Sequence, residues 1–345
     1  IHHELGMECI DCHHSYELMG DGNFYQHQEE QEDVQCIDCH FNGKPKLIAA
    51  ADLDNETALI ASIRYGNFSD RKFLLTNKQN HALVNTLFEN NSAYMIRKKD
   101  SKIFKLTPPA DVCTGNLAHK DLSCSSCHSE WVPTCIGCHN KYDENEAGYN
   151  MITNKEKQGS WVEFIGEYNA KMPSMGKRIT NKGKEIIPVV PGMILSIDKA
   201  SYSKNPSDSS IFHRLFAPAA PHTTSAQGRT CKSCHNNSVA LGYGEGNLEY
   251  SIFDGKGTWN FTPLYENDSH DQLPLDAWTG FLKERVGKVS TRSNVFPFDL
   301  IEQKKILTVG ACLNCHEENS KVMRQSLNNF EELLSKRSSS CILPN

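Results

Sequence analysis

Residues 124–139 read CSSCHSEWVPTCIGCH and contain two copies of the pentapeptide Cys-x-x-Cys-His, with six residues between them. The first copy is Cys124, Cys127 and His128, and the second is Cys135, Cys138 and His139. This pentapeptide is the attachment pattern of c-type haem, in which two thiols add across the vinyl groups of the porphyrin and the adjacent histidine binds the iron. Two copies this close together predict two haems in near contact.

The same pattern occurs six times along the chain and uses twelve of its fourteen cysteines. The cysteines are Cys9 and Cys12, Cys36 and Cys39, Cys124 and Cys127, Cys135 and Cys138, Cys231 and Cys234, and Cys312 and Cys315; the histidines are His13, His40, His128, His139, His235 and His316. Zinc ribbons also use paired Cys-x-x-Cys, but zinc does not require a histidine after every second cysteine. A thioredoxin-like motif would need a βαβ unit, which no surrounding segment resembles. The sequence therefore predicts six covalent haems, with the six motif histidines as proximal iron ligands.

The composition agrees with a protein that fills its interior with cofactors. Only 38% of the 345 residues are hydrophobic, and the mean hydropathy is −0.52. Porphyrins would supply the missing apolar volume. The formal net charge of −6 argues against a nucleic-acid partner, which would call for a basic patch.

The cellular location follows from the cofactor chemistry. Because c-type haem is attached outside the cytoplasm, and because the chain begins at Ile1, we expect a processed, exported protein in the periplasm or outside the cell. The sequence has no run of eighteen apolar residues, so we expect no transmembrane segment within it.

The expected fold class is a multihaem cytochrome c, mostly irregular, with short α-helices and a few β-hairpins wrapped around a stacked haem chain. We divide the chain into an N-terminal di-haem segment (1–48), a haem-free insert (49–112), a central twin-haem segment (113–140), a hairpin-containing connector (141–222) and a C-terminal segment with two motifs and a terminal helix (223–345). Shared haems would join these segments into one continuous body.

A few local elements have clear signals. Asp54 as N-cap and Gly66 as terminator predict a helix with Leu59, Ile60 and Ile63 on one face. Small strands and turns are expected over 71–107. A hairpin is expected about Pro191-Gly192, and Pro188 in its first strand predicts that this strand lies at a sheet edge. A second hairpin is expected through Asp254-Gly255. The apolar spacing over 319–336 predicts an amphipathic helix packed on the body.

Nine of the fifteen histidines lie outside the motifs, enough to give every haem a second histidine ligand. The distal candidates are His2, His27, His119, His213, His222 and His270, whereas His3 and His81 are interpreted as surface residues. The number of spare histidines favours electron transfer, because a catalytic haem leaves one axial position open.

Two cysteines stand outside the motifs. A disulfide between Cys113 and Cys341 is expected in an oxidising compartment, with free thiols or an intermolecular bridge as alternatives. A third interpretation makes Cys113, six residues before His119, a thiolate near a haem that lowers its potential or takes part in sulfur chemistry.

The segments HHELGMECIDCH, HKDLSCSSCHSEWVPTCIGCH, PHTTSAQGRTCKSCHNN and ILTVGACLNCH resemble segments of the multihaem c-type cytochromes of metal- and sulfur-respiring anaerobes, among them octahaem tetrathionate reductase-like proteins and extracellular electron-transfer cytochromes. This resemblance implies haems stacked in near-parallel and near-perpendicular pairs. The sequence Cys-x-x-Cys-His-His at His14 is similar to that of the small tetrahaem cytochromes of sulfate reducers, which implies that His14 ligates a different haem from His13.

These observations predict electron transfer along six c-type haems, to or from an extracellular or periplasmic redox partner, without a catalytic residue. One alternative is a reductase of a small sulfur or nitrogen oxyanion at one open-site haem. Another is a subunit of a cytochrome filament or outer-membrane conduit, a homopolymer in which the early His2 and His3 are compatible with ligation of a neighbouring subunit's haem.

Overall fold

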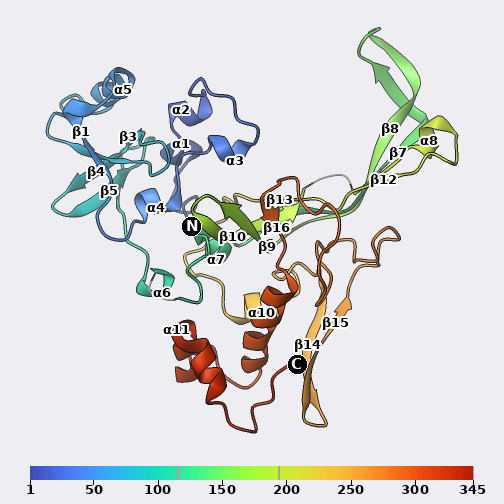
Figure 1. Cartoon of the computed structure of the whole chain (residues 1–345). Helices are drawn as coiled ribbons and strands as arrows, with labels where there is room; N and C mark the ends of the chain where they lie inside the picture. Colours follow the sequence, from blue (N-terminus) through green and yellow to red (C-terminus); the bar gives the residue numbers. More distant parts are fainter. Residues whose placement is uncertain (115–116, 193–194, 345) are drawn as a thin grey trace. The chain divides into compact units, whose positions relative to one another are not determined.

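The computed structural model describes residues 1–114, 117–192 and 195–344 (Figure 1). The chain divides into two compact units, Ile1–Asn116 and Leu117–Asn345. The boundary falls inside the predicted central segment 113–140, so that Cys113 belongs to the first unit and both motifs of residues 124–139 belong to the second.

The predicted fold class is wrong, because the protein is a mixed, sheet-rich fold with 31% strand and 22% helix. It contains several separate sheets of two to four strands. Extended segments satisfy their backbone N–H and C=O groups by pairing with one another, instead of running as irregular chain. None of the helices among the described residues is long and apolar enough to cross a membrane.

The first unit combines short helices with two three-stranded antiparallel sheets, ordered β1-β2-β3 and β4-β5-β6. Its helices are α1 (Cys9–Cys12), α2 (Ser15–Leu18), α3 (Gln28–Gln31), α4 (Cys36–Cys39), the 3₁₀-helix η1 (Ala50–Asp52), α5 (Asn55–Tyr65) and α6 (Asp111–Thr114). Its strands are β1 (Leu47–Ala49), β2 (Lys72–Leu75), β3 (Ala82–Leu83), β4 (Thr86–Glu89), β5 (Ser92–Ile96) and β6 (Ile103–Lys105). The small strands expected over 71–107 are therefore confirmed.

Helix α5 begins and ends where its capping residues predict. The Asp54 carboxylate accepts the Thr57 N–H at 2.9 Å, and Gly66 follows the last turn with a positive φ of 65°. The predicted face is wrong, because Leu59 and Ile63 are 60% and 78% exposed. The side that packs against Phe73 carries the smaller Ala61, which is fully buried.

The second unit holds the longer strands and helices. Its helices are α7 (Cys124–His128), α8 (Ala200–Ser203), α9 (Lys232–His235), α10 (Leu300–Cys312) and α11 (Lys321–Ser335). Its strands are β7 (Val132–Asn150), β8 (Lys155–Lys171), β9 (Ser174–Thr180), β10 (Gly183–Pro191), β11 (Ser196–Asp198), β12 (Ile211–Phe212), β13 (Phe216–Pro218), β14 (Gly246–Phe253), β15 (Lys256–Pro263) and β16 (Val295–Phe296). They form sheets ordered β13-β10-β9-β16, β12-β11-β7-β8 and β14-β15. The terminal amphipathic helix is confirmed as α11.

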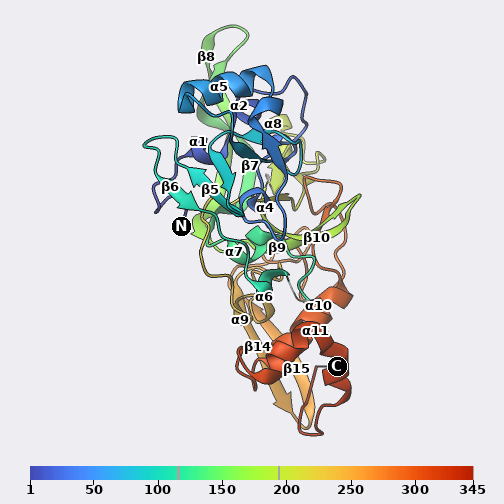
Figure 2. The same cartoon turned by 90° about the vertical axis from the view of Figure 1, so that its left-hand side faces the viewer.

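Only one of the two predicted hairpins exists. Strands β14 and β15 pair through Asp254 and Gly255, both with positive φ, and lie beside α10 in both views (Figures 1 and 2). The hairpin about Pro191-Gly192 is wrong: β10 pairs with β9 and β13, whereas β11 pairs with β7 and β12. Residues 193–194 of that prediction lie outside the described residues. Pro188 is in an internal strand, not at an edge, and pairing with β13 begins one residue later, at Val189.

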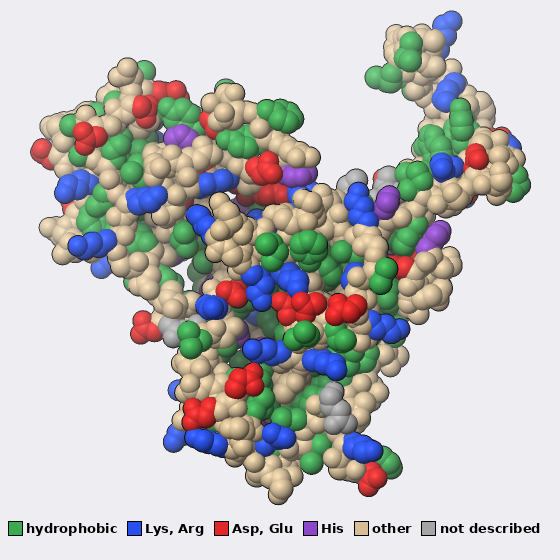
Figure 3. Space-filling model, viewed as in Figure 1, with side chains coloured by type: hydrophobic (Ala, Val, Ile, Leu, Met, Phe, Trp, Pro, Cys, Tyr) green, Lys and Arg blue, Asp and Glu red, His purple; other side chains and the backbone are tan. Residues whose placement is uncertain are grey.

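Strands β7 and β8 are the longest strands of the second unit and pair as a hairpin. The outer end of this hairpin projects away from the rest of that unit (Figure 1). On the face drawn in Figure 3, its surface carries apolar, basic and acidic side chains. Tyr168 is 68% exposed and Ile152 near the tip is 96% exposed.

Candidate functional site: the cysteine and histidine clusters

Five of the six motifs lie in helical turns. Motifs one to three coincide with α1, α4 and α7, the fifth overlaps α9, and the sixth begins at the last residue of α10. In four of them the histidine N–H donates to the carbonyl of the first motif cysteine, at 2.8–2.9 Å. A helical turn brings residues three apart onto one side, so each turn presents its two thiols together.

Three of these turns, α1, α4 and α7, begin with a local capping signal. Asp11 and Asp38 at the third position of α1 and α4 accept the backbone N–H of the residue before the helix, at 2.8 and 2.7 Å. Ser123 accepts the Ser126 N–H at the start of α7. The residue types that separate the cysteines therefore stabilise the turn that pairs them.

The motif histidines share a second feature: the structure gives a hydrogen-bond partner for the ring Nδ1 of five of them. His40, His128 and His235 donate to the carbonyl oxygens of Thr107, Ser225 and Ile306 at 2.8, 2.9 and 3.0 Å. A carbonyl oxygen only accepts, so Nδ1 carries the hydrogen and Nε2 keeps its lone pair. Metal-binding histidines are oriented in this way, which is how the residues present fit a haem iron.

The other two partners are side chains, a carboxylate and a hydroxyl. His13 Nδ1 lies 2.6 Å from Glu17 Oε2, and His139 Nδ1 lies 2.7 Å from Ser196 Oγ. The sequence spacing of the motifs carries no signal for the distant acceptors, which come from segments 57–97 residues away.

The fourth motif differs from the others, because it lies in strand β7. Cys138 is buried, and its thiol donates to Glu163 Oε1 on β8 at 2.8 Å. Burial, with this carboxylate as the next cause, raises the pKa of the Cys138 thiol to about 12. The His139 ring is held by Ser196 and could bind an iron. The Cys138 thiol could attach a haem only after its hydrogen bond to Glu163 breaks.

Two histidines outside the motifs lie opposite motif histidines. The ring centres of His2 and His40 are 6.0 Å apart, and those of His119 and His235 are 6.2 Å apart. Two imidazoles on opposite sides of one metal ion would stand roughly 6.3 Å apart, given metal–nitrogen bonds of about 2.0 Å. Both separations therefore suit a pair of axial ligands.

The protonation of these rings also suits ligation. Burial lowers the pKa of His2, and the charges of His40 and of the N-terminus lower it further. Burial also lowers the pKa of His119. Burial lowers the pKa of His235 to about 4. Neutral imidazoles keep a lone pair available for a metal. The structure places the distal candidate His119 against His235 of the fifth motif.

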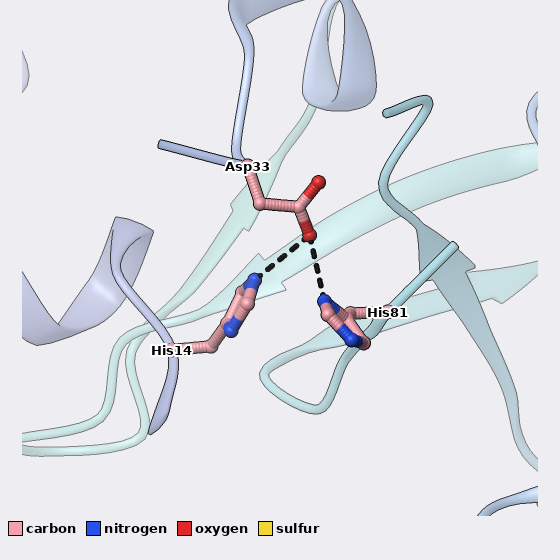
Figure 4. Close-up of side chains that lie close together, drawn as sticks. All are labelled: His14, Asp33 and His81. Atoms are coloured by element: carbon pink, nitrogen blue, oxygen red, sulfur yellow. Dashed lines mark hydrogen bonds and ion pairs between the residues drawn. The ribbon is translucent and has the colours of Figure 1, made fainter. Parts of the chain in front are cut away.

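A third cluster joins His14, Asp33 and His81 in the first unit (Figure 4). Asp33 is 1% exposed, and its Oδ2 accepts from His14 Nε2 at 3.1 Å and from His81 Nδ1 at 3.0 Å. Each ring thus donates one N–H to the carboxylate and keeps its other nitrogen as an acceptor. His14 Nδ1 is buried without a hydrogen-bond partner among the described residues. His81, interpreted from the sequence as a surface residue, is therefore held in place by a buried carboxylate.

The remaining distal candidates have other surroundings. His27 is the residue before α3, and the His213 backbone donates to Leu195 O at 2.9 Å. His222 is exposed in the loop after β13, and His3 is exposed near the N-terminus. His270 bonds to Asp268 at 2.8 Å and stacks on Phe212 at 4.6 Å. The structure does not bring His27, His213 or His270 into a ring pair with a motif histidine among the described contacts.

Cys113 and Cys341 belong to different units of the chain, and the structure has both as free thiols, one of the alternatives to the expected disulfide. Cys113 is exposed in α6 of the first unit. Cys341 lies near the sixth motif in the second unit, where burial and then the Cys341 charge raise the pKa of Cys312.

Comparison with protein families, curated proteins and solved structures found no match to this chain. The residues and their geometry therefore carry the functional argument alone.

Proposed function

We propose that this chain carries six covalently attached c-type haems and passes electrons along them to or from another redox protein. The observation that carries the proposal is the orientation of the motif histidines: in four of six motifs a carbonyl or carboxylate oxygen accepts the Nδ1 hydrogen and leaves Nε2 for a metal. A zinc ribbon would use the thiols as ligands and would not require this orientation after every Cys-x-x-Cys.

The chain's own residues would attach, orient and isolate the cofactor. In each motif the two thiols would hold the haem by adding across its vinyl groups, each thiol hydrogen passing to the neighbouring vinyl carbon. The motif histidine would bind the iron, and His2 and His119, which lie near His40 and His235, would supply a second ligand at the second and fifth motifs. The haem iron supplies the reversible one-electron chemistry.

A second histidine ligand at the second and fifth motifs would favour an electron carrier over a reductase, because those two irons would have no coordination site open to a substrate. Since c-type haem is attached outside the cytoplasm, we propose an exported protein that acts in the periplasm or outside the cell. Its partners would be other cytochromes or redox proteins.

The test is production of the chain in a host with the c-type haem attachment machinery. We expect six haems per chain by pyridine haemochrome assay and by mass spectrometry of the unfolded protein, with low-spin haems at least at the second and fifth motifs. His119→Ala should convert about one haem in six to high spin because it removes the ligand opposite His235, whereas the exposed His3→Ala should leave the spectrum unchanged. A purified chain without covalent haem, or with zinc in its place, would refute the proposal.

A further inference from the structure

Glu17 differs from every other described partner of a motif histidine, because it brings a negative charge. It lies in α2, one turn after the first motif, and its side chain is 4% exposed. Its Oε2 accepts from His13 Nδ1 at 2.6 Å. The corresponding acceptors for His40, His128 and His235 are uncharged backbone carbonyls, and that for His139 is a serine hydroxyl.

The structure holds this carboxylate in place from its other side. Glu17 Oε1 accepts the backbone N–H groups of Asp33 at 2.5 Å and Val34 at 3.1 Å. Three hydrogen bonds, from the His13 ring and from two backbone N–H groups, hold both oxygens of this carboxylate in place. The backbone of the 33–34 segment therefore positions a charge against one histidine ring.

A carboxylate hydrogen-bonded to a ligating imidazole makes the imidazole a stronger electron donor. A stronger donor favours the more positive oxidation state of the metal that it binds, and so lowers the reduction potential. A neutral carbonyl at the same nitrogen orients the ring but adds much less electron density. The low dielectric around a buried charge increases the difference.

We propose that Glu17 makes the redox centre held by His13 the lowest-potential centre of the chain, so that electrons pass downhill from the first motif to the other five. This inference rests on the proposed function, and it adds a direction to the electron path. Glu17 acts through His13 and is a positioning and tuning residue.

The test is a spectroscopic redox titration of the holoprotein carrying Glu17→Gln. The amide keeps an oxygen for the backbone N–H groups of Asp33 and Val34 but removes the charge. We expect the lowest of the six one-electron transitions to rise by about tenfold in its reduction equilibrium, ~59 mV, with the others unchanged.

Two further variants separate tuning from structural damage. Glu8→Gln removes a charge of the same sign directly before Cys9, where the side chain pairs with Lys99 at 2.7 Å. We expect a smaller shift from Glu8→Gln than from Glu17→Gln. Glu17→Asp keeps the charge, and it should retain a lower potential than Glu17→Gln with the same melting temperature as that variant.

Equal shifts from Glu8→Gln and Glu17→Gln, or no shift from Glu17→Gln at full haem content, would overturn the inference. Because haem content is measured on every variant, failure of the proposed function would show as missing haem, and failure of this inference would show as unchanged potentials in a fully loaded protein.

Discussion

At the scale of single residues, the protein fixes the direction of each imidazole with one hydrogen bond. A histidine ring can rotate about its side-chain bonds and can carry its hydrogen on either nitrogen, so a free ring would present the wrong atom part of the time. The hydrogen bond to the Ile306 carbonyl fixes both the ring rotation and the tautomer of His235, and the bond to the Ser225 carbonyl does the same for His128. Ligand orientation is thus established by the polypeptide before an iron is bound.

Asp276 gives a pH dependence at the same scale. Burial raises its pKa to about 6; its Oδ2 accepts the Glu245 N–H at 2.6 Å, and its Oδ1 has no hydrogen-bond partner among the described residues. A raised folded-state pKa means that the folded chain binds the proton more tightly than the unfolded chain. The contribution to stability is therefore present below pH 3.8 and is lost as pH rises through about 6.

We expect Asp276→Asn to raise the free energy of unfolding at pH 7 by up to about 3 kcal/mol, at about 1.4 kcal/mol per pKa unit, and to have no stabilising effect at pH 3.5. Urea unfolding at the two pH values measures the difference. The control is Asp254→Asn, an exposed turn position with φ 49° that suits asparagine equally well. A gain at pH 7 no larger than that at pH 3.5 would contradict the assignment.

The sequence was sufficient to identify the motif residues but not their partners. Cys-x-x-Cys-His is a local pattern, so the six motif histidines can be read directly from the chain. Thr107 and Ile306 act through backbone carbonyls, which every residue type possesses, and they lie 67 and 71 residues from the histidines that they orient. His81 lacked any local signal, because Asp33, which holds it, is 48 residues away.

At the scale of elements, helix α10 links two motifs. It ends at Cys312 of the sixth motif, and its Ile306 carbonyl orients His235 of the fifth. Trp259 of β15 donates to the Leu307 carbonyl at 3.0 Å and holds the helix from the hairpin side. The close approach of α10 to α9 depends on Gly310, where a Cβ would lie 2.5 Å from the His235 carbonyl oxygen.

We expect Gly310→Ala to push α10 away from α9 and to lower stability by about 1–3 kcal/mol, the usual cost of overpacking. Because Ile306 would move away from His235, part of the fifth haem should become high spin. Thermal unfolding and the electronic spectrum measure the two effects. Lys305→Ala, at an exposed position on the same helix, should change neither; an unaltered spectrum and melting temperature in Gly310→Ala would show that the contact is unimportant.

Elements with strong local signals were predicted well, and those defined by distant pairing were not. The caps of α5, the Asp254-Gly255 turn and the amphipathic spacing of α11 each lie within a few residues. Strand β10 was predicted to fold back on the segment after Pro191, but its partners β9 and β13 are chosen by tertiary packing of Val189 and Phe216. The fourth motif lies in a strand because β8 pairs with it, which its spacing could not indicate.

At the scale of the whole molecule, each unit contains its own pair of opposed histidines. His2 and His40 both belong to the first unit, and His119 and His235 both belong to the second. The motifs divide in the same way, with two in the first unit and four in the second. An axial pair within one unit adds a cross-link between segments far apart in the sequence, so haem binding would stabilise each unit separately.

This arrangement bears on whether copies of the chain join through their haems. A polymer joined by His2 would require this residue to leave its place 6.0 Å from His40 and to bind the iron of another copy. His2 is partly buried in its own unit, and this burial lowers its pKa. Binding the iron of another copy would therefore remove the ring from the position beside His40 that it already occupies. We therefore expect His2→Ala to convert about one haem in six to high spin while the molar mass in solution stays unchanged. Light scattering coupled to size-exclusion chromatography measures the mass, and the electronic spectrum measures the spin state.

Exposed His3→Ala is the matched control and should alter neither the mass nor the spin state. If wild-type chains form long assemblies that His2→Ala dissolves, then His2 ligates between copies and the pairing with His40 is wrong.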